Sequence, residues 1–503
     1  METSIIKIIF FIIIISIPVV PQNEGKAEKD TSNKFAYSNL TEFGNQMNDI
    51  FNDPNFSNAN WGVIIQSLKT GEYFYKRNED KLFIPASNMK LFTTAGGLIL
   101  LGEDYRFVTK IYARGKLDGS TLEGDLIWQG GGDPTISGRF HDDNVFKVFE
   151  NWADSLQSKG IDEISGNIIG DDNKFDDVGL GKGWSWDHES YWYSAPSSAI
   201  SFNDNCVDLI ISVNHKNKKA IIKTVPDTKY IVIVNNVVVV PKDSSTNIDV
   251  YRQRGTNIVS VFGTIKNADD SVKTFVTVNN PTQYSIVVLK DILQKKGITV
   301  DGYPVDVDDI TAPLDYNSMS LLFNYYSPPL KEIIKVINKN SQNFFAEQLL
   351  KTIGYEKLGW GTSVNGVEAL SPVFKDMGIN PESMVMVDGS GLSPLNLVSP
   401  RQILNLLSYM YKSKYFVAFY NSLPIAGVDG TMGERLKNSN AVDKIRAKPG
   451  YLDGVRSLSG YAYTADNEPV AFSIIVNNFV VPVKLAENIQ DLVCLRLVNF
   501  KRK

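Results

Sequence analysis

Ser87 and Lys90 have the spacing of a nucleophilic hydroxyl and its base on one turn of a helix. They lie in the segment Ile-Pro-Ala-Ser-Asn-Met-Lys-Leu-Phe-Thr-Thr-Ala, residues 84–95. Side chains three positions apart share a helix face, so the lysine amine can reach the serine hydroxyl. A serine at a helix start also lies at the positive end of the helix dipole, which favours an alkoxide-like charge. A capping serine followed by a surface lysine gives the same spacing, so the pair needs support from the rest of the chain.

The histidine content restricts the other ways of activating a serine. The chain has three histidines, His141, His188 and His215, all in polar contexts typical of surface residues. The histidines therefore give little support to a Ser-His-Asp triad or a multi-histidine zinc site, and lysine is the expected base. The two cysteines, Cys206 and Cys494, are far apart in the chain. We expect them to be buried free thiols.

Two later segments supply what a serine-lysine site would need. The tripeptide Ser-Gln-Asn at 341–343 opens an apolar-periodic helix, and Lys-Pro-Gly at 448–450 begins strand-like sequence. The ordered elements S-x-x-K, S-x-N and K-x-G are the serial signature of penicillin-recognising serine enzymes. Any one of them arises by chance, whereas all three in order, each in a suitable context, indicate this class of chemistry.

On these motifs the chain resembles the D-alanyl-D-alanine carboxypeptidase/endopeptidase family of class C low-molecular-mass penicillin-binding proteins. The resemblance runs from about residue 35 to about residue 500. Further segments that support it are 124–135, 183–187, 193–196, 327–330, 388–393, 423–427 and 457–461.

The resemblance implies an α/β (α+β) fold, in which a β-lactamase/transpeptidase-like serine enzyme domain is split by a large, mostly β insertion. Residues 35–108 and 318–503 are expected to form the discontinuous catalytic domain. Residues 109–317 are expected to form the insertion, with two submodules. The sequence agrees with this division, because Ser87 and Ser341 are much further apart than one helix pair requires.

Short hydrophobic runs indicate the elements on either side of this division. Residues 208–213, 230–240 and 272–278 are β-branched runs bounded by turn-forming residues, which is typical of strands. The flanking segments 91–101, 329–338 and 342–351 have helical patterns. Residues 459–463 and 469–477 are expected to be strands that follow the lysine strand at 448 in an antiparallel sheet, and 484–500 a terminal amphipathic helix.

The resemblance also implies roles for the motif residues. Ser87 attacks the carbonyl of the penultimate D-alanine and Lys90 takes its proton. Lysine must be neutral to do so, and desolvation or a second cation lowers its pKa. Ser341 bridges Lys90 to the second cation, Lys448, and passes the proton to the leaving amine.

Other residues are expected to bind the substrate. The side-chain amide of Asn343 orients a peptide carbonyl, and the backbone N–H groups of Ser87 and Tyr451 form the oxyanion hole. The expected substrate-binding residues are Asn343, Lys448, Gly450, Tyr451 and Leu452.

Pro449 departs from the family pattern, which usually has threonine at this position. In the related enzymes the threonine hydroxyl helps to hold the terminal carboxylate of the substrate. Proline has no hydroxyl and no backbone N–H, so the lost contact is worth about 1–3 kcal/mol. Proline is tolerated on edge strands, so we expect weaker carboxylate recognition and an intact fold.

The expected function is a serine D-Ala-D-Ala carboxypeptidase that acts on peptidoglycan peptides through an acyl-enzyme, with DD-endopeptidase activity left open. β-Lactam antibiotics are expected to acylate it, and no metal or cofactor is implied. The formal charge of −5 gives no field for nucleic acid. A serine β-lactamase is the first alternative, although its compact form lacks such an insertion. A cell-wall-binding protein of the same fold with weakened turnover is the second, and Pro449 favours it.

The N-terminal sequence predicts export to the periplasm. Residues 1–22 have one lysine followed by a short apolar core, which is typical of a signal peptide. The apolar run at 8–20 is too short for a comfortable membrane span. The cleavage site is not clear from the sequence, so an uncleaved anchor stays open.

Overall fold

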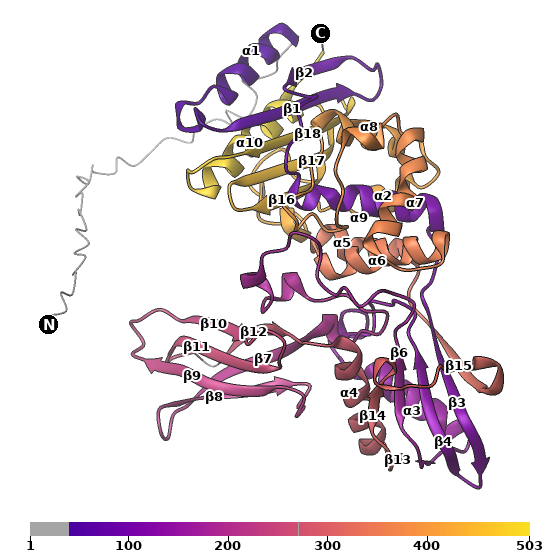
Figure 1. Cartoon of the computed structure of the whole chain (residues 1–503). Coiled ribbons are helices and arrows are strands. Elements are labelled where there is room, and N and C mark those ends of the chain that lie inside the picture. Colours follow the sequence, from indigo (N-terminus) through magenta and orange to yellow (C-terminus); the bar gives the residue numbers. More distant parts are fainter. Residues whose placement is uncertain (1–39, 270, 503) are drawn as a thin grey trace, which may run out of the picture.

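The computed structural model of the protein describes residues 40–269 and 271–502. The predicted signal peptide, 1–22, lies outside the described residues. Within the described ranges no helix is both long and apolar enough to cross a membrane. A five-stranded sheet with helices on both faces occupies one end of the molecule, and residues 108–326 form a separate group of sheets at the other end (Figure 1).

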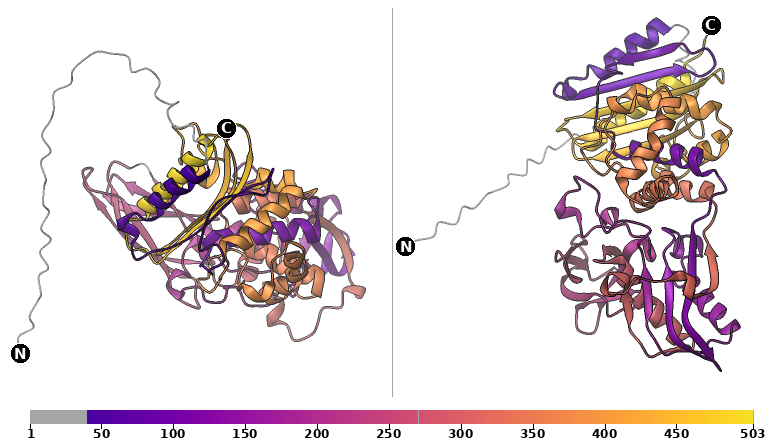
Figure 2. Two further views of the ribbon diagram at one scale, coloured as in Figure 1. Left: turned by 90° about the horizontal axis from the view of Figure 1, so that it is seen from above. Right: turned by 45° about the vertical axis from the view of Figure 1, so that its right-hand side comes forward.

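The five-stranded sheet is antiparallel and has the order β16-β17-β18-β1-β2. Successive side chains of a strand point to opposite faces. On β1, Val63 and Ile65 pack with α1 and α10 on one face, whereas Ile64 packs with the other helices on the opposite face. Figure 2 shows the helices on the two faces of this sheet. The elements are β1 (Asn60–Ser67), β2 (Tyr73–Arg77), β16 (Ile445–Leu452), β17 (Val455–Tyr463), β18 (Pro469–Asn477), α1 (Leu40–Phe51) and α10 (Val483–Asn499).

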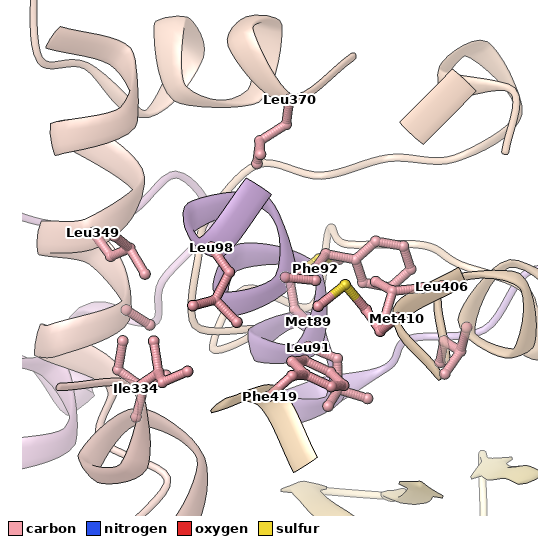
Figure 3. Close-up of a cluster of buried hydrophobic side chains, with 14 of the residues drawn as sticks. Met89, Leu91, Phe92, Leu98, Ile334, Leu349, Leu370, Leu406, Met410 and Phe419 are labelled. Atoms are coloured by element: carbon pink, nitrogen blue, oxygen red, sulfur yellow. The ribbon is translucent and has the colours of Figure 1, made fainter. Parts of the chain in front are cut away.

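Helix α2 (Met89–Leu101) is the centre of the helical layer on the second face. Its residues 89–98 are all buried, as expected of a helix that is apolar on every side. A Cβ on Gly96 would lie 2.0 Å from the Leu370 side chain, so glycine permits close helix packing here. Figure 3 shows side chains of this core around α2. The surrounding helices are α5 (Leu330–Lys339), α6 (Asn343–Leu358), α7 (Ser363–Asp376), α8 (Pro400–Lys412) and α9 (Phe416–Ser422).

The insertion contains a seven-stranded sheet, and the chain both enters and leaves the insertion through strands of this sheet. β3 starts at Val108, and β15 returns antiparallel to it through Tyr326. β15 lies just past the expected end of the insertion, at 317, and pairs with the strand on which the chain entered. The elements are β3 (Val108–Asp118), β4 (Thr121–Gln129), β5 (Glu163–Ile164), β6 (Ile168–Asp171), β13 (Thr299–Val300), β14 (Pro304–Asp306), β15 (Ser320–Tyr326), α3 (Lys147–Ser158) and α4 (Pro281–Lys295).

Two three-stranded sheets complete the insertion, with the orders β12-β7-β8 and β10-β11-β9. Their buried residues belong to the same hydrophobic core as α3, α4 and the seven-stranded sheet. The strands are β7 (Cys206–Asn214), β8 (Lys219–Val225), β9 (Val232–Val240), β10 (Asn247–Arg252), β11 (Ile258–Lys266) and β12 (Val272–Thr277). The division of the chain into domains stays a prediction; this arrangement of sheets supports it.

Candidate active site

Ser87 lies in a short 3-10 turn that leads directly into α2. The side chain of Asn88 donates to the carbonyl of Lys448 at 2.7 Å. The hydroxyl of Ser457 donates to the carbonyl of Pro85, also at 2.7 Å. Side chains on both sides of Ser87 therefore tie its turn to β16 and β17, which fixes the serine relative to the sheet.

Lys90 is fully buried on the first turn of α2, beneath Ser87. Its Nζ donates to Ser87 Oγ at 3.1 Å, to Asn343 Oδ1 at 2.6 Å and to the carbonyl of Ser390 at 2.7 Å. Burial lowers the pKa of Lys90 to about 7 by penalising the ammonium form. A substantial fraction of this lysine is thus neutral near pH 7, which a general base requires.

Two buried acids lie near Lys90. Glu347 and Asp388 both accept backbone hydrogen bonds from the loop 388–393, and Asp388 also accepts one from Trp184 Nε1 at 2.9 Å. Burial raises the pKa of Glu347 to about 7 and also raises the pKa of Asp388. Their charges favour the ammonium of Lys90 and oppose the larger effect of desolvation. From the sequence alone we assigned no chemical step to this loop, which places the Ser390 carbonyl against the base.

Ser341 connects the nucleophile to the second lysine. Its hydroxyl lies 3.1 Å from Ser87 Oγ, and Lys448 Nζ donates to it at 2.8 Å. Burial lowers the pKa of Lys448 well below its ordinary value, and the positive charge of Lys90 lowers it further. Ser341 has a φ of +57°, a conformation that a non-glycine residue holds only when its surroundings impose it. The turn between α5 and α6 therefore aims this hydroxyl into the site.

The open edge of β16 faces the site. β16 is an edge strand of the sheet, and Lys448 Nζ donates to the carbonyl of Pro449 at 3.0 Å. In an antiparallel strand the N–H and C=O groups of one residue point to the same side, and the direction repeats every second residue. The backbone N–H of Tyr451 is therefore directed outward from the edge, on the same side as the Pro449 carbonyl.

Gly450 lies directly against the serine turn. A Cβ at this position would be 2.9 Å from the backbone nitrogen of Ser87 and 2.3 Å from Ser457 Oγ. Only a residue without a side chain lets the strand approach this closely. The close approach brings the backbone N–H groups of positions 87 and 451 to the same part of the site.

A cavity of about 580 Å³ opens over these residues. Its walls include His188, Trp192 and Tyr193, which the insertion contributes. His188 is thus part of the cavity wall, whereas the sequence favoured a surface position outside any site. It reaches the wall because the fold places the insertion beside the catalytic residues. Further lining residues that sequence reasoning missed are Thr431, Arg435, Asp453, Arg456 and Glu487. The aromatic residues at 184–193 could have indicated that the insertion contributes to the cavity wall. No pattern in the sequence singled out the two arginines.

The structure brings all eight expected site residues together. The side-chain amide of Asn343 makes two hydrogen bonds: its Oδ1 accepts from Lys90 Nζ, and its Nδ2 donates to the carbonyl of Tyr193 at 2.7 Å. Ser87, Lys90, Ser341, Asn343 and Lys448 form one hydrogen-bonded set, and Gly450, Tyr451 and Leu452 line the cavity beside it. Cys206 and Cys494 are buried free thiols, as predicted.

Comparisons with known proteins agree with this chemistry. The chain matches the D-Ala-D-Ala carboxypeptidase 3 (S13) family over residues 44–497. It is 30% identical over 501 residues to a D-alanyl-D-alanine carboxypeptidase of Actinomadura sp. (strain R39), covering 97% of this chain and 90% of that protein. It is 27% identical over 427 residues to the D-alanyl-D-alanine carboxypeptidase DacB of Haemophilus influenzae, covering 84% and 86%.

Solved structures show the same relationship. The crystal structure of penicillin binding protein 4 (dacB) from Haemophilus influenzae superposes with a TM-score of 0.76 at 26% identity, over 88% of this chain and 97% of that one. A second structure of that protein, in complex with a β-lactam, superposes with a TM-score of 0.70 at 25% identity over the same shares.

Proposed function

The chain belongs to the D-Ala-D-Ala carboxypeptidase 3 (S13) family and is a serine-type D-Ala-D-Ala carboxypeptidase, and from that premise we propose that Ser87 is its nucleophile and Lys90 its base. The observation that carries this assignment is the hydrogen-bonded chain from Lys90 through Ser87 and Ser341 to Lys448. It supplies a nucleophile, a base that is partly neutral near pH 7 and a route for the proton.

In acylation, Ser87 Oγ attacks the carbonyl carbon of the penultimate D-alanine and its proton passes to the neutral amine of Lys90. The carbonyl oxygen becomes an oxyanion, which accepts hydrogen bonds from the backbone N–H groups of Ser87 and Tyr451. Such preorganised donors contribute most where charge develops in the transition state.

Collapse of the tetrahedral intermediate breaks the C–N bond to the terminal D-alanine. The leaving nitrogen takes a proton from the Ser341 hydroxyl, and Ser341 is reprotonated with the proton that Lys90 took from Ser87, so that Lys90 is neutral again. Free D-alanine departs and leaves an ester on Ser87. Water then attacks the ester carbonyl and gives a proton to Lys90, which returns it to Ser87 Oγ as the ester C–O bond breaks, and the shortened peptide is released.

Peptidoglycan stem peptides are the substrate, and β-lactam antibiotics acylate the same serine. The family supports the first statement and the β-lactam complex of the Haemophilus influenzae relative supports the second. Export to the periplasm follows from the nature of this substrate and from the signal-like sequence at 1–22.

The assignment is tested by incubating the protein with penicillin and locating the added mass in a proteolytic digest. We expect the adduct on the peptide that contains Ser87, and release of D-alanine from an acyl-D-Ala-D-Ala peptide in a parallel assay. An adduct on another residue would refute the assignment of the nucleophile, and rapid loss of the adduct would indicate a β-lactamase. A digest of purified peptidoglycan, analysed by mass, separates D-alanine release from cleavage of cross-links.

A further inference from the structure

The cavity continues past Ser87 around the edge of β16, where it meets two arginines. Arg456 on β17 is paired in register with Tyr451 on β16. Directly paired residues of an antiparallel sheet share a face, and side chains two apart on a strand also share a face. Pro449, Tyr451 and Arg456 therefore lie on one face, opposite to Lys448 and Gly450. Arg456 lies over the Tyr451 ring, with its Cζ 5.0 Å from the ring centroid.

Arg435 lines the same end of the cavity and is buried, with 8% of its surface exposed. Its Nε and Nη2 donate to Asp491 Oδ1 at 3.0 and 2.7 Å. Its Nη1 has no hydrogen-bond partner among the described residues, and neither has Nε of Arg456. Each guanidinium therefore has one buried nitrogen without a partner, which is costly for a charged group.

The charges around the two arginines leave room for an anion. Glu487 on α10 forms an ion pair with Arg456 and lines the cavity beside it. The same carboxylate also pairs with the exposed Lys484 at 3.3 Å, so it has a second partner at the surface. Burial and the neighbouring charge of Arg435 lower the pKa of Arg456 to about 10. A further carboxylate in this place would relieve the repulsion between the two guanidinium groups.

We propose that Arg456, supported by Arg435, binds the free C-terminal carboxylate of the substrate and replaces the hydroxyl that Pro449 lacks. Arginine suits this ligand because its planar group presents paired donors to a carboxylate. In the free enzyme the Glu487 carboxylate forms an ion pair with Arg456. When the substrate carboxylate binds, Glu487 releases Arg456 and keeps its ion pair with Lys484. The inference rests on the proposed function, because the carboxylate belongs to the terminal D-alanine of the substrate that this function assigns.

The test compares two substrates, a diacyl-lysyl-D-Ala-D-Ala peptide and the same peptide with a C-terminal carboxamide. We expect the natural protein to prefer the free acid by about tenfold or more in kcat/KM, the range of a charge-assisted hydrogen bond. Arg456→Gln should remove most of this preference through a higher KM for the acid, and should leave the amide unchanged. Arg446→Gln is the matched control, since Arg446 lies on β16 but bonds to Asn421 outside the cavity. It should keep the preference.

Glu487→Gln should change KM for the acid in the direction opposite to Arg456→Gln. Removing the competing carboxylate should lower KM for the acid several-fold without changing KM for the amide. The inference is overturned if Arg456→Gln lowers activity on acid and amide equally, if it keeps the preference, or if Glu487→Gln leaves KM for the acid unchanged.

A carboxylate-free active ester separates this inference from the proposed function. If the ester does not acylate Ser87 in the natural protein, the proposed function fails. If it labels Ser87 in the natural protein and in Arg456→Gln alike while the preference for the acid is unaffected, only the carboxylate site is refuted.

Discussion

Lys90 and Lys448 are connected through only two hydroxyl groups, those of Ser87 and Ser341. Both lysines are fully buried, and two ammonium ions in one dry site repel each other. Burial lowers the pKa of both lysines, and the charge of Lys90 lowers the pKa of Lys448 further. The four groups therefore hold and exchange protons as a unit, so removing one side chain or shifting the pKa of a lysine should change the rate of acylation.

Ser87→Ala should abolish covalent labelling by penicillin while the protein stays folded, because the nucleophile carries the acyl group. Mass spectrometry of the intact protein measures the adduct, and circular dichroism checks the fold. A penicillin adduct on the folded variant would show that another residue is the nucleophile.

Lys90→Ala should slow acylation by about 10²–10⁴-fold, the usual contribution of a general base. No histidine forms a hydrogen bond to the Ser87 hydroxyl among the described residues, so no second base is at hand. The rate of penicillin labelling under single-turnover conditions gives the comparison. A rate near that of the natural protein would mean that Lys90 does not take the proton.

The acylation rate should rise with pH and level off above about pH 7, because Lys90 must lose its proton and burial lowers its pKa to about 7. Glu347→Gln removes a carboxyl group that is about half ionised near pH 7 and whose negative charge favours the ammonium form of Lys90. The pKa of Lys90 should then fall further, so the acid limb of the profile should move to lower pH. The profile of penicillin labelling between pH 5 and pH 9 measures the shift, which should be less than about one unit. A limb that stays in place or moves to higher pH would contradict this electrostatic account.

Gly450→Ala should reduce acylation by about 10²–10³-fold, the cost of losing one oxyanion-hole donor. The added methyl group would lie 2.9 Å from the Ser87 backbone nitrogen, so the turn or the strand must move. The thermal unfolding midpoint distinguishes this local effect from loss of the fold. A fully active and stable alanine variant would show that β16 does not position the serine turn.

Pro449→Thr should raise kcat/KM on a D-alanyl-D-alanine peptide, because it restores a hydroxyl on the face that carries Arg456. The gain should be larger in the Arg456→Gln background, about tenfold, where no guanidinium assists. Steady-state kinetics of the single and double variants on one peptide at one pH measure both effects. An equal or lower value in the threonine variant would show that this cleft holds the carboxylate through other groups.

The sequence was sufficient for the parts of the site that depend on local spacing. The three-residue interval from Ser87 to Lys90 fixes a shared helix face, and α2, α6 and β16 lie where their patterns predicted them. The burial of Lys90 also follows from the apolar helix around it. These features need only a few consecutive residues, so they can be read without knowing the fold.

The sequence was not sufficient for contacts between distant segments. Tyr193 reaches Asn343 from the insertion, and Glu347 lies near Lys90 because α6 packs against α2, with the loop at 388–393 bonded to both side chains. Of the two arginines, Arg435 lies in a turn and Arg456 on a strand whose register sets its face. No local pattern encodes such pairs, which is why residues of the cavity wall were missed.

Strand β1 pairs along its whole length with β18, from Asn60 with Asn477 to Ser67 with Val470. Strands so distant in the chain meet late, since closing the long intervening loop costs entropy before any contact is gained. Ribosomes add about 5–20 residues per second, so β1 can pair early with its neighbour β2, but its other edge stays without β18 for tens of seconds after it is made. The turn of Ser87 depends on β16 and β17 for its anchors. A partly synthesised chain therefore has its serine but no assembled site, and the timing of synthesis itself keeps the enzyme inert until the protein is almost complete.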